Sequence, residues 1–181
     1  MARLKEIYEK EIIPSMMKKF GYKNSMMVPR VKKVCLNMGV GSAKNDPKTL
    51  ESAKKSLALI SGQQPAVTRA KRSIAGFNLR QDTPIGCKVT MRRYRMYEFL
   101  DRLFNLAIPR IKDFQGISLD QFDNRGNFTL GLTEQLVFPE ISYDEVGVIH
   151  GLSVAIVTTA VNDEEARELL TSLGLPFKNR N

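Results

Sequence analysis

The sequence has few of the residues that build disulfide, metal or nucleophile chemistry. Its 181 residues include two cysteines and one histidine. Cys35 and Cys87 lie far apart and outside any CxxC pattern, so neither a disulfide framework nor a zinc site is indicated, and two buried or half-buried thiols are expected. A nucleophile–histidine pair would need His150, whose place at the entry to a predicted strand is more typical of a structural histidine. We expect no metal and no cofactor.

Long apolar runs are also missing. No stretch approaches the roughly 18 residues of a membrane span, and the N-terminus MARLKEIYEKEIIP is charged where a signal peptide would be apolar. We therefore expect a cytoplasmic protein without a membrane partner. No internal repeat or low-complexity tract appears. The length and the 43% hydrophobic composition are typical of a single domain over residues 1–181.

Signals for nucleotide chemistry are weak. GVGSAK at 39–44 places two glycines after a predicted strand, but it lacks the third glycine and the GK[ST] ending of phosphate-binding loops. The carboxylates at 163–165 lie in the first turn of a predicted helix, where they favour the helix dipole. Neither feature requires a catalytic role.

Positive charge is concentrated in the first half of the chain. Residues 1–95 carry 21 Lys and Arg against 6 Asp and Glu, a net +15, whereas residues 96–181 carry 7 against 13, a net −6. This asymmetry indicates a polyanion on the basic side and a neutral or basic partner on the acidic side. A solvated helix surface explains Lys54 and Lys55, but many other basic residues lie on strand-like or loop-like segments.

Hydrophobic periodicity predicts helices interspersed with strands. Helical signals cover 3–20 with an interruption near Pro14, 47–61 after the N-cap Asp46, 95–108 up to Pro109, and 162–174 with a capping-box-like start. Alternation predicts strands within 29–41, 65–71, 85–93, 128–132 and 151–160. Strict βαβ order is absent and turn-rich segments join the strand pairs. We therefore predict an α+β fold, an antiparallel sheet with helices packed mainly on one face.

The other face of that sheet would present polar side chains. Lys33, Cys35 and Asn37 alternate with an apolar row, as do Lys88, Thr90 and Arg92. Amides and hydroxyls can read RNA loop bases while basic side chains hold phosphates. The candidate amide and hydroxyl residues are Asn37, Gln63, Gln64, Thr68 and Thr90. The candidate basic residues are Lys33, Arg69, Lys71, Arg92 and Arg93. No paired stacking aromatics of the RNP type accompany them.

A glycine-broken loop, SIAGFNLRQDTP at 73–84, connects two predicted strands. Its apolar side chains either tuck into the core and anchor the loop or project with it from the sheet edge as a finger. In the second case Gly76 allows close backbone approach to a ligand, the apolar side chains pack on sugars and bases, and flanking arginines hold phosphates. The candidate contact residues are Ser73, Ile74, Ala75, Gly76, Phe77, Asn78, Leu79 and Arg80.

Four long motifs, in order, resemble one protein family. They are PRVKKVCLNMGVG, SIAGFNLRQDTPIGCKVTMR, FDNRGNFTLGLTEQLVFPEISYDE and TTAVNDEEARELLTSLGLPF. Together they resemble the bacterial large-subunit ribosomal protein five, the family that binds 5S ribosomal RNA, from residue 1 to residue 179. The resemblance implies a five-stranded antiparallel sheet flanked by helices and a structural, non-enzymatic role in the central protuberance of the large subunit.

The same resemblance implies partners for each part of the chain. The strand carrying Asn37, residues 63–68 and the strand carrying Thr90 would form the 5S rRNA face. Contacts with 23S rRNA and neighbouring large-subunit proteins would accompany it. The projecting loop 73–84 would reach the elbow of the P-site tRNA, and the turn-rich excursion 110–145 would form a bridge to a small-subunit head protein.

Two other function classes remain open at this point. An RNA-modifying enzyme acting on structured RNA would need a catalytic group and usually a cofactor pocket, which the motifs do not supply. A basic protein that organises DNA or binds a membrane surface would not discriminate 5S rRNA from other polyanions. The RNA pulled down from ribosome-free extract would separate these classes.

Overall fold

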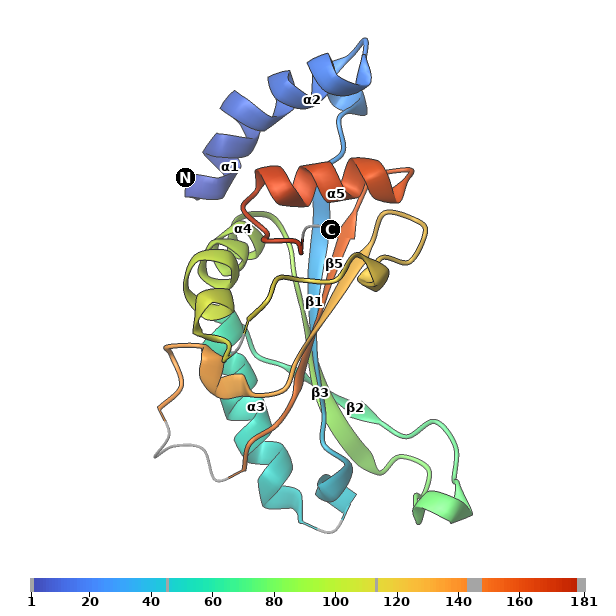
Figure 1. The fold of residues 1–181 in the computed structure, drawn as a ribbon. Helices are drawn as coiled ribbons and strands as arrows, with labels where there is room; N and C mark the ends of the chain where they lie inside the picture. The colour runs from blue at the N-terminus through green and yellow to red at the C-terminus, as the bar shows by residue number, and fades with distance from the viewer. Residues whose placement is uncertain (1, 45, 113, 143–147, 179–181) are drawn as a thin grey trace. The chain divides into compact units, whose positions relative to one another are not determined.

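The computed structural model describes residues 2–44, 46–112, 114–142 and 148–178. Within these ranges five strands form one antiparallel sheet in the order β2-β3-β1-β5-β4 (Figure 1). The strands are β1 Val31–Gly39, β2 Ala66–Arg69, β3 Pro84–Met91, β4 Phe128–Leu132 and β5 Leu152–Thr158. Helices complete an α+β fold, so the predicted class and the predicted antiparallel sheet are confirmed.

The helices follow local sequence signals closely. They are α1 Arg3–Ile7, α2 Ile13–Phe20, α3 Pro47–Ser61, α4 Arg93–Arg102 and α5 Asp163–Ser172. At α3, the Asp46 side chain accepts a hydrogen bond of 3.0 Å from the Lys48 backbone N–H, and Pro47 occupies the first position. Gly62 ends this helix with a left-handed φ of 62°. The predicted bounds of this helix are confirmed.

Two helices differ from the prediction in detail. A π-helical turn, Tyr8–Ile12, joins α1 to α2 just before Pro14, whose ring nitrogen has no proton to donate to the preceding turn. The strand predicted over 85–93 ends at Met91, and α4 begins at Arg93 instead of residue 95. Arg93 has a φ of 56°, so the chain leaves the strand direction earlier than the apolar alternation suggests.

The described residues divide into two compact units. Unit 1 comprises those within 1–34, 91–130 and 155–181, and unit 2 those within 35–90 and 131–154. In unit 1, the buried side chains of α1, α2, α4 and α5 include Leu4, Met16, Phe99 and Leu169. Lys19 of α2 and Glu168 of α5 form an ion pair of 2.6 Å, which ties these two helices together. A single domain over residues 1–181 stays a prediction.

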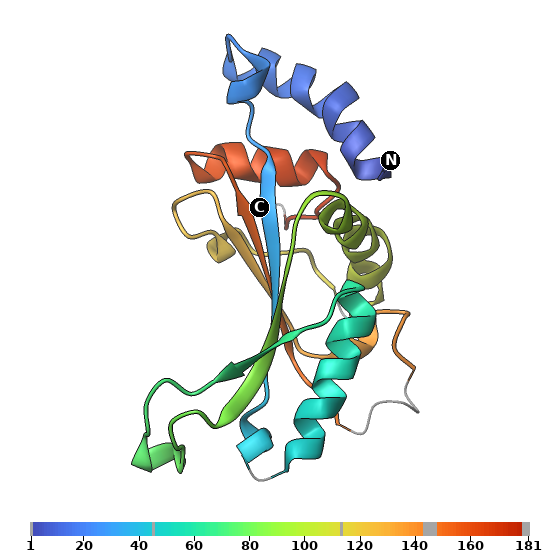
Figure 2. The same cartoon turned by 180° about the vertical axis from the view of Figure 1, so that it is seen from behind.

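In unit 2, α3 covers one side of β1 and β3 (Figures 1 and 2). Leu57 and Ile60 of α3 are fully buried, as are Leu36 of β1 and Cys87 of β3. The positive charge of Lys54, also on α3, acts on the Cys87 thiol, in agreement with this packing. The alternate residues of the strands therefore point to the side that α3 leaves uncovered. No helix in the described ranges is both long and apolar enough to cross a membrane.

Candidate nucleic-acid interface

The uncovered side of β1 and β3 has a defined antiparallel register. The Val40 backbone N–H donates to the Ile85 carbonyl oxygen at 2.9 Å, and Cys35 Sγ lies 3.6 Å from Thr90 Oγ1. Both contacts fit one antiparallel register, because the sum of the paired residue numbers is the same. The half-buried hydroxyl of Thr90 is therefore held beside Cys35 on this side of the sheet.

The same register places an amide next to an ammonium group. It puts Asn37 of β1 opposite Lys88 of β3, and Lys88 in turn pairs with Ala66 of β2. Asn37 and Lys88 are both exposed, and Thr68 lies half-buried in the next row. We call this surface the strand face and define it as Asn37, Ala66, Thr68, Lys88 and Thr90. It presents donors and acceptors beside a positive charge, as RNA recognition requires.

The structure places all of the predicted RNA-binding residues where a partner can reach them. Unit 2 holds Asn37, Gln63, Gln64, Thr68, Arg69, Lys71 and Thr90, and unit 1 holds Lys33, Arg92 and Arg93; each is exposed or half-buried. Lys88 is not among these predicted residues, although its alternation with Cys87 and Val89 assigns it to the polar face. Its position opposite Asn37 adds it to the candidate site.

Two candidates are held by neighbours in the fold. The buried Ser61 hydroxyl donates to the Gln63 carbonyl oxygen at 3.0 Å and lies 3.3 Å from the Gln63 backbone nitrogen. These contacts fix the turn that presents Gln63 and Gln64 after α3. Arg69 Nη1 donates to the Asp82 carbonyl oxygen at 3.0 Å, so this arginine braces the base of the 73–84 loop.

The loop 73–84 closes on itself and extends away from α3 (Figures 1 and 2). The backbones of Ile74 and Leu79 exchange hydrogen bonds of 2.8 and 3.1 Å, and the Gln81 N–H donates to Ser73 Oγ at 2.9 Å. The Ile74 side chain is 45% exposed and that of Phe77 is 69% exposed. The interpretation in which these two side chains tuck into the core is therefore wrong.

Titratable groups in the described part of the chain show no catalytic arrangement. Burial raises the pKa of the Cys87 thiol, which keeps it protonated. Burial also lowers the pKa of His150, which is 8% exposed and neutral near pH 7. Within the described ranges, no group of three or more His, Cys, Asp or Glu side chains is placed to hold a metal ion.

Comparison with known proteins matches nearly the whole chain. The model of a family described as "Ribosomal protein L5" matches residues 24–80, and a second model, for the C-terminus of the same ribosomal protein family, matches residues 84–177. The chain is 58% identical over 177 residues to the "Large ribosomal subunit protein uL5" of Caldanaerobacter subterraneus subsp. tengcongensis, covering 98% of this chain and 99% of that protein. The protein of the same name from Syntrophomonas wolfei subsp. wolfei is 58% identical over 178 residues, 98% of this chain and 100% of that protein.

Proposed function

This chain belongs to the ribosomal protein L5 family, and from that membership we propose that it binds 5S rRNA through the strand face of unit 2. Members of the family are structural proteins of the large ribosomal subunit and act in the cytoplasmic ribosome during translation. The expectation that the chain is not an enzyme is confirmed by this membership, and the RNA-modifying alternative is set aside. Ribosomal RNA and ribosomal proteins are its partners.

The observation that carries the proposal is the pairing of Asn37 with Lys88 on the uncovered side of the sheet. An exposed amide can donate to and accept from a base edge, and the adjacent ammonium can hold a phosphate of the same strand. The Thr68 and Thr90 hydroxyls extend this row of donors and acceptors along β2 and β3. A rigid strand platform holds these groups at fixed spacing, which favours one RNA shape over bulk polyanion.

The projecting loop is proposed to contact the P-site tRNA. Its exposed Ile74 and Phe77 side chains offer apolar surface to sugars and bases, and the exposed Arg80 side chain offers charge to phosphates. Its internal backbone hydrogen bonds give it a defined shape before any partner arrives.

The acidic second half is proposed to bridge to a basic small-subunit head protein, with charge complementarity setting orientation more than affinity. Within 110–145 the described acidic residues include Asp120 and Glu134, and both are exposed. Asp113 and Asp144, which belong to the same predicted excursion, lie outside the described residues. A crosslinker attached near Asp120 is expected to reach a small-subunit protein in assembled ribosomes, and crosslinks confined to large-subunit RNA would argue against the bridge.

The central test is a pull-down from ribosome-free extract at moderate salt, with the intact chain as bait. Sequencing of the recovered RNA is expected to show strong enrichment of 5S rRNA over tRNA and other structured RNAs. The double variant Asn37→Ala, Thr90→Val should lose that enrichment while remaining folded. Recovery of RNAs in proportion to their abundance by the unmodified chain would contradict specific 5S rRNA binding.

A further inference from the structure

A hollow of about 640 Å³ opens in unit 1 where the start of α1, the start of β1 and the first turn of α4 meet. Its lining includes Lys5, Arg30, Lys32, Arg93, Tyr94 and Tyr97. Its size falls within the range of roughly 300–1,000 Å³ that is usual for small-ligand pockets. Lysine, arginine and tyrosine from three separate segments thus converge on one concave surface.

The charge on this surface is of one sign. Four of the lining side chains are basic and none is acidic. Lys5 pairs with Glu9 at 3.5 Å one helical turn away, but both side chains are largely exposed, so the pair is weak. For Arg30, Lys32 and Arg93, no ion pair forms with any carboxylate in the described part of the chain. Clustered cations in a concave site raise the local concentration of anions.

The floor of the hollow is aromatic. The Tyr97 side chain is buried, whereas that of Tyr94 is 58% exposed and presents a ring to the solvent. The Arg30 charge acts on the phenols of both Tyr97 and Tyr8, so this guanidinium lies close to the tyrosine floor. The Tyr94 hydroxyl hydrogen-bonds to Glu98, which lies outside the lining, and this bond fixes the ring orientation. An exposed, oriented ring beside cations is a stacking platform for an unpaired base.

The backbone at Arg93 is also unusual. Its φ of 56° lies in the left-handed region that residues other than glycine rarely adopt. The first turn of α4 receives no hydrogen bond from an N-cap side chain, because Arg92 at that position makes none. A phosphate held by the surrounding cations would thus also lie near a favourable helix end.

We propose that this hollow is an RNA-binding site, distinct in its residues from the strand face, which takes one unpaired nucleotide together with its flanking phosphates. The base stacks on Tyr94 while Arg30, Lys32 and Arg93 hold the phosphates. The inference rests on the proposed function in taking RNA as the partner. It differs in naming single-stranded RNA as the ligand class and unit 1 as its place.

The test uses the intact chain and a fluorescently labelled, unstructured eight-nucleotide RNA of mixed sequence. The double variant Arg30→Ala, Lys32→Ala is expected to bind this RNA at least tenfold more weakly near physiological salt. The slope of log affinity against log salt should fall by about one to two units. Tyr94→Ala should weaken binding, whereas Tyr94→Phe should retain it, because the ring and not the hydroxyl supplies the stacking surface.

Two matched controls make the result specific. Lys54→Ala, Lys55→Ala removes two basic side chains on α3 and should leave binding of the oligonucleotide unchanged. Asn37→Ala, Thr90→Val should weaken 5S rRNA binding but not oligonucleotide binding, so failure of the strand-face proposal and failure of this one are distinguishable. Wild-type affinity in the Arg30, Lys32 variant would overturn the inference. Equal or stronger competition by duplex RNA or by an acidic peptide would also overturn it.

Discussion

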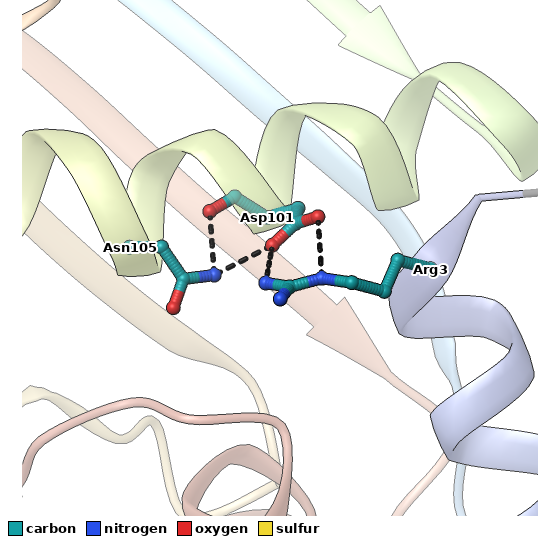
Figure 3. Close-up of polar contacts among 3 residues, drawn as sticks. All are labelled: Arg3, Asp101 and Asn105. Carbon is teal, nitrogen blue, oxygen red and sulfur yellow. Dashed lines mark hydrogen bonds and ion pairs between the residues drawn. The ribbon is translucent and has the colours of Figure 1, made fainter.

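Arg3 and Asp101 form a two-pronged ion pair that joins α1 to α4 (Figure 3). Arg3 Nη2 lies 2.6 Å from Asp101 Oδ1, and Arg3 Nε donates to Oδ2 at 3.2 Å. Asn105 Nδ2, one turn further along the helical path, donates to the same carboxylate at 2.5 Å. The hydrogen bond and the charge of Asp101 raise the pKa of Arg3. This contact holds Lys5 at the rim of the basic hollow.

Asp101→Asn keeps the shape of this contact and removes its charge. Because the Arg3 side chain is exposed, the melting temperature should change little. The start of α1 should open more often, and hydrogen–deuterium exchange over residues 4–8 should become several-fold faster. Arg3→Lys, which keeps the charge but loses the fork, should show an intermediate rate. Unchanged exchange in Asp101→Asn would mean that apolar packing alone holds α1.

The strand face should separate affinity from discrimination. Lys88→Ala should lower the slope of log affinity for 5S rRNA against log salt by about one unit or less. Asn37→Ala should leave that slope nearly unchanged and should reduce the preference for 5S rRNA over tRNA, because the amide contacts bases and not phosphates. Lys55→Ala, on the exposed side of α3, is the matched charge control and should change neither quantity. Filter binding at several salt concentrations measures both.

Gly86 should be the position on β3 that least tolerates a side chain. A Cβ added there would collide with the Met38 carbonyl oxygen and would lie 3.1 Å from Thr68 Oγ1. Gly86→Ala should therefore lower the free energy of unfolding by about 1–3 kcal/mol in urea denaturation. Gly39→Ala, on the adjacent strand, is the control, because its added Cβ has no neighbour within 4 Å. Equal losses in the two variants would contradict this steric explanation.

The 73–84 loop should be dispensable for folding. Replacing residues 75–78 with Asn-Gly keeps the Ile74–Leu79 backbone pair and closes a two-residue hairpin. The variant should fold and bind 5S rRNA like the unmodified chain, while ribosomes that carry it should release P-site tRNA faster. Phe77→Leu, which retains apolar surface, should release tRNA at an intermediate rate. Unfolding or loss of 5S rRNA binding in the shortened variant would show that the loop is part of the scaffold.

His150 should make stability depend on pH below neutrality. Burial lowers its pKa from 6.5 in the folded state, so the unfolded chain binds the proton more readily. The free energy of unfolding should therefore be constant above pH 7 and should fall as the pH drops below about 6.5. His150→Gln should remove this contribution between pH 7 and 5.5. NMR titration of this single histidine gives the folded-state pKa directly, and a value at or above 6.5 would contradict the explanation.

Several elements follow from local signals that can be read along the chain. Asp46, Pro47 and Gly62 specify the bounds of α3 because capping and left-handed termination act within a few residues. Alternation in β1 and β3 separates buried from polar positions because successive strand residues point to opposite faces. The family motifs indicate the class of partner for the same reason, since each is a continuous run of residues.

The meeting of distant residues depends on how the elements pack. Arg3 and Asp101 are 98 residues apart, and no periodic pattern links them. The pairing of Asn37 with Lys88 depends on strand register, a property of two segments and not of either one. The basic hollow likewise requires α1, β1 and α4 to converge, and the left-handed turn at Arg93 ends β3 against its own alternation. Short-range propensities specify the elements, whereas packing and register, which act between segments, assemble the sites.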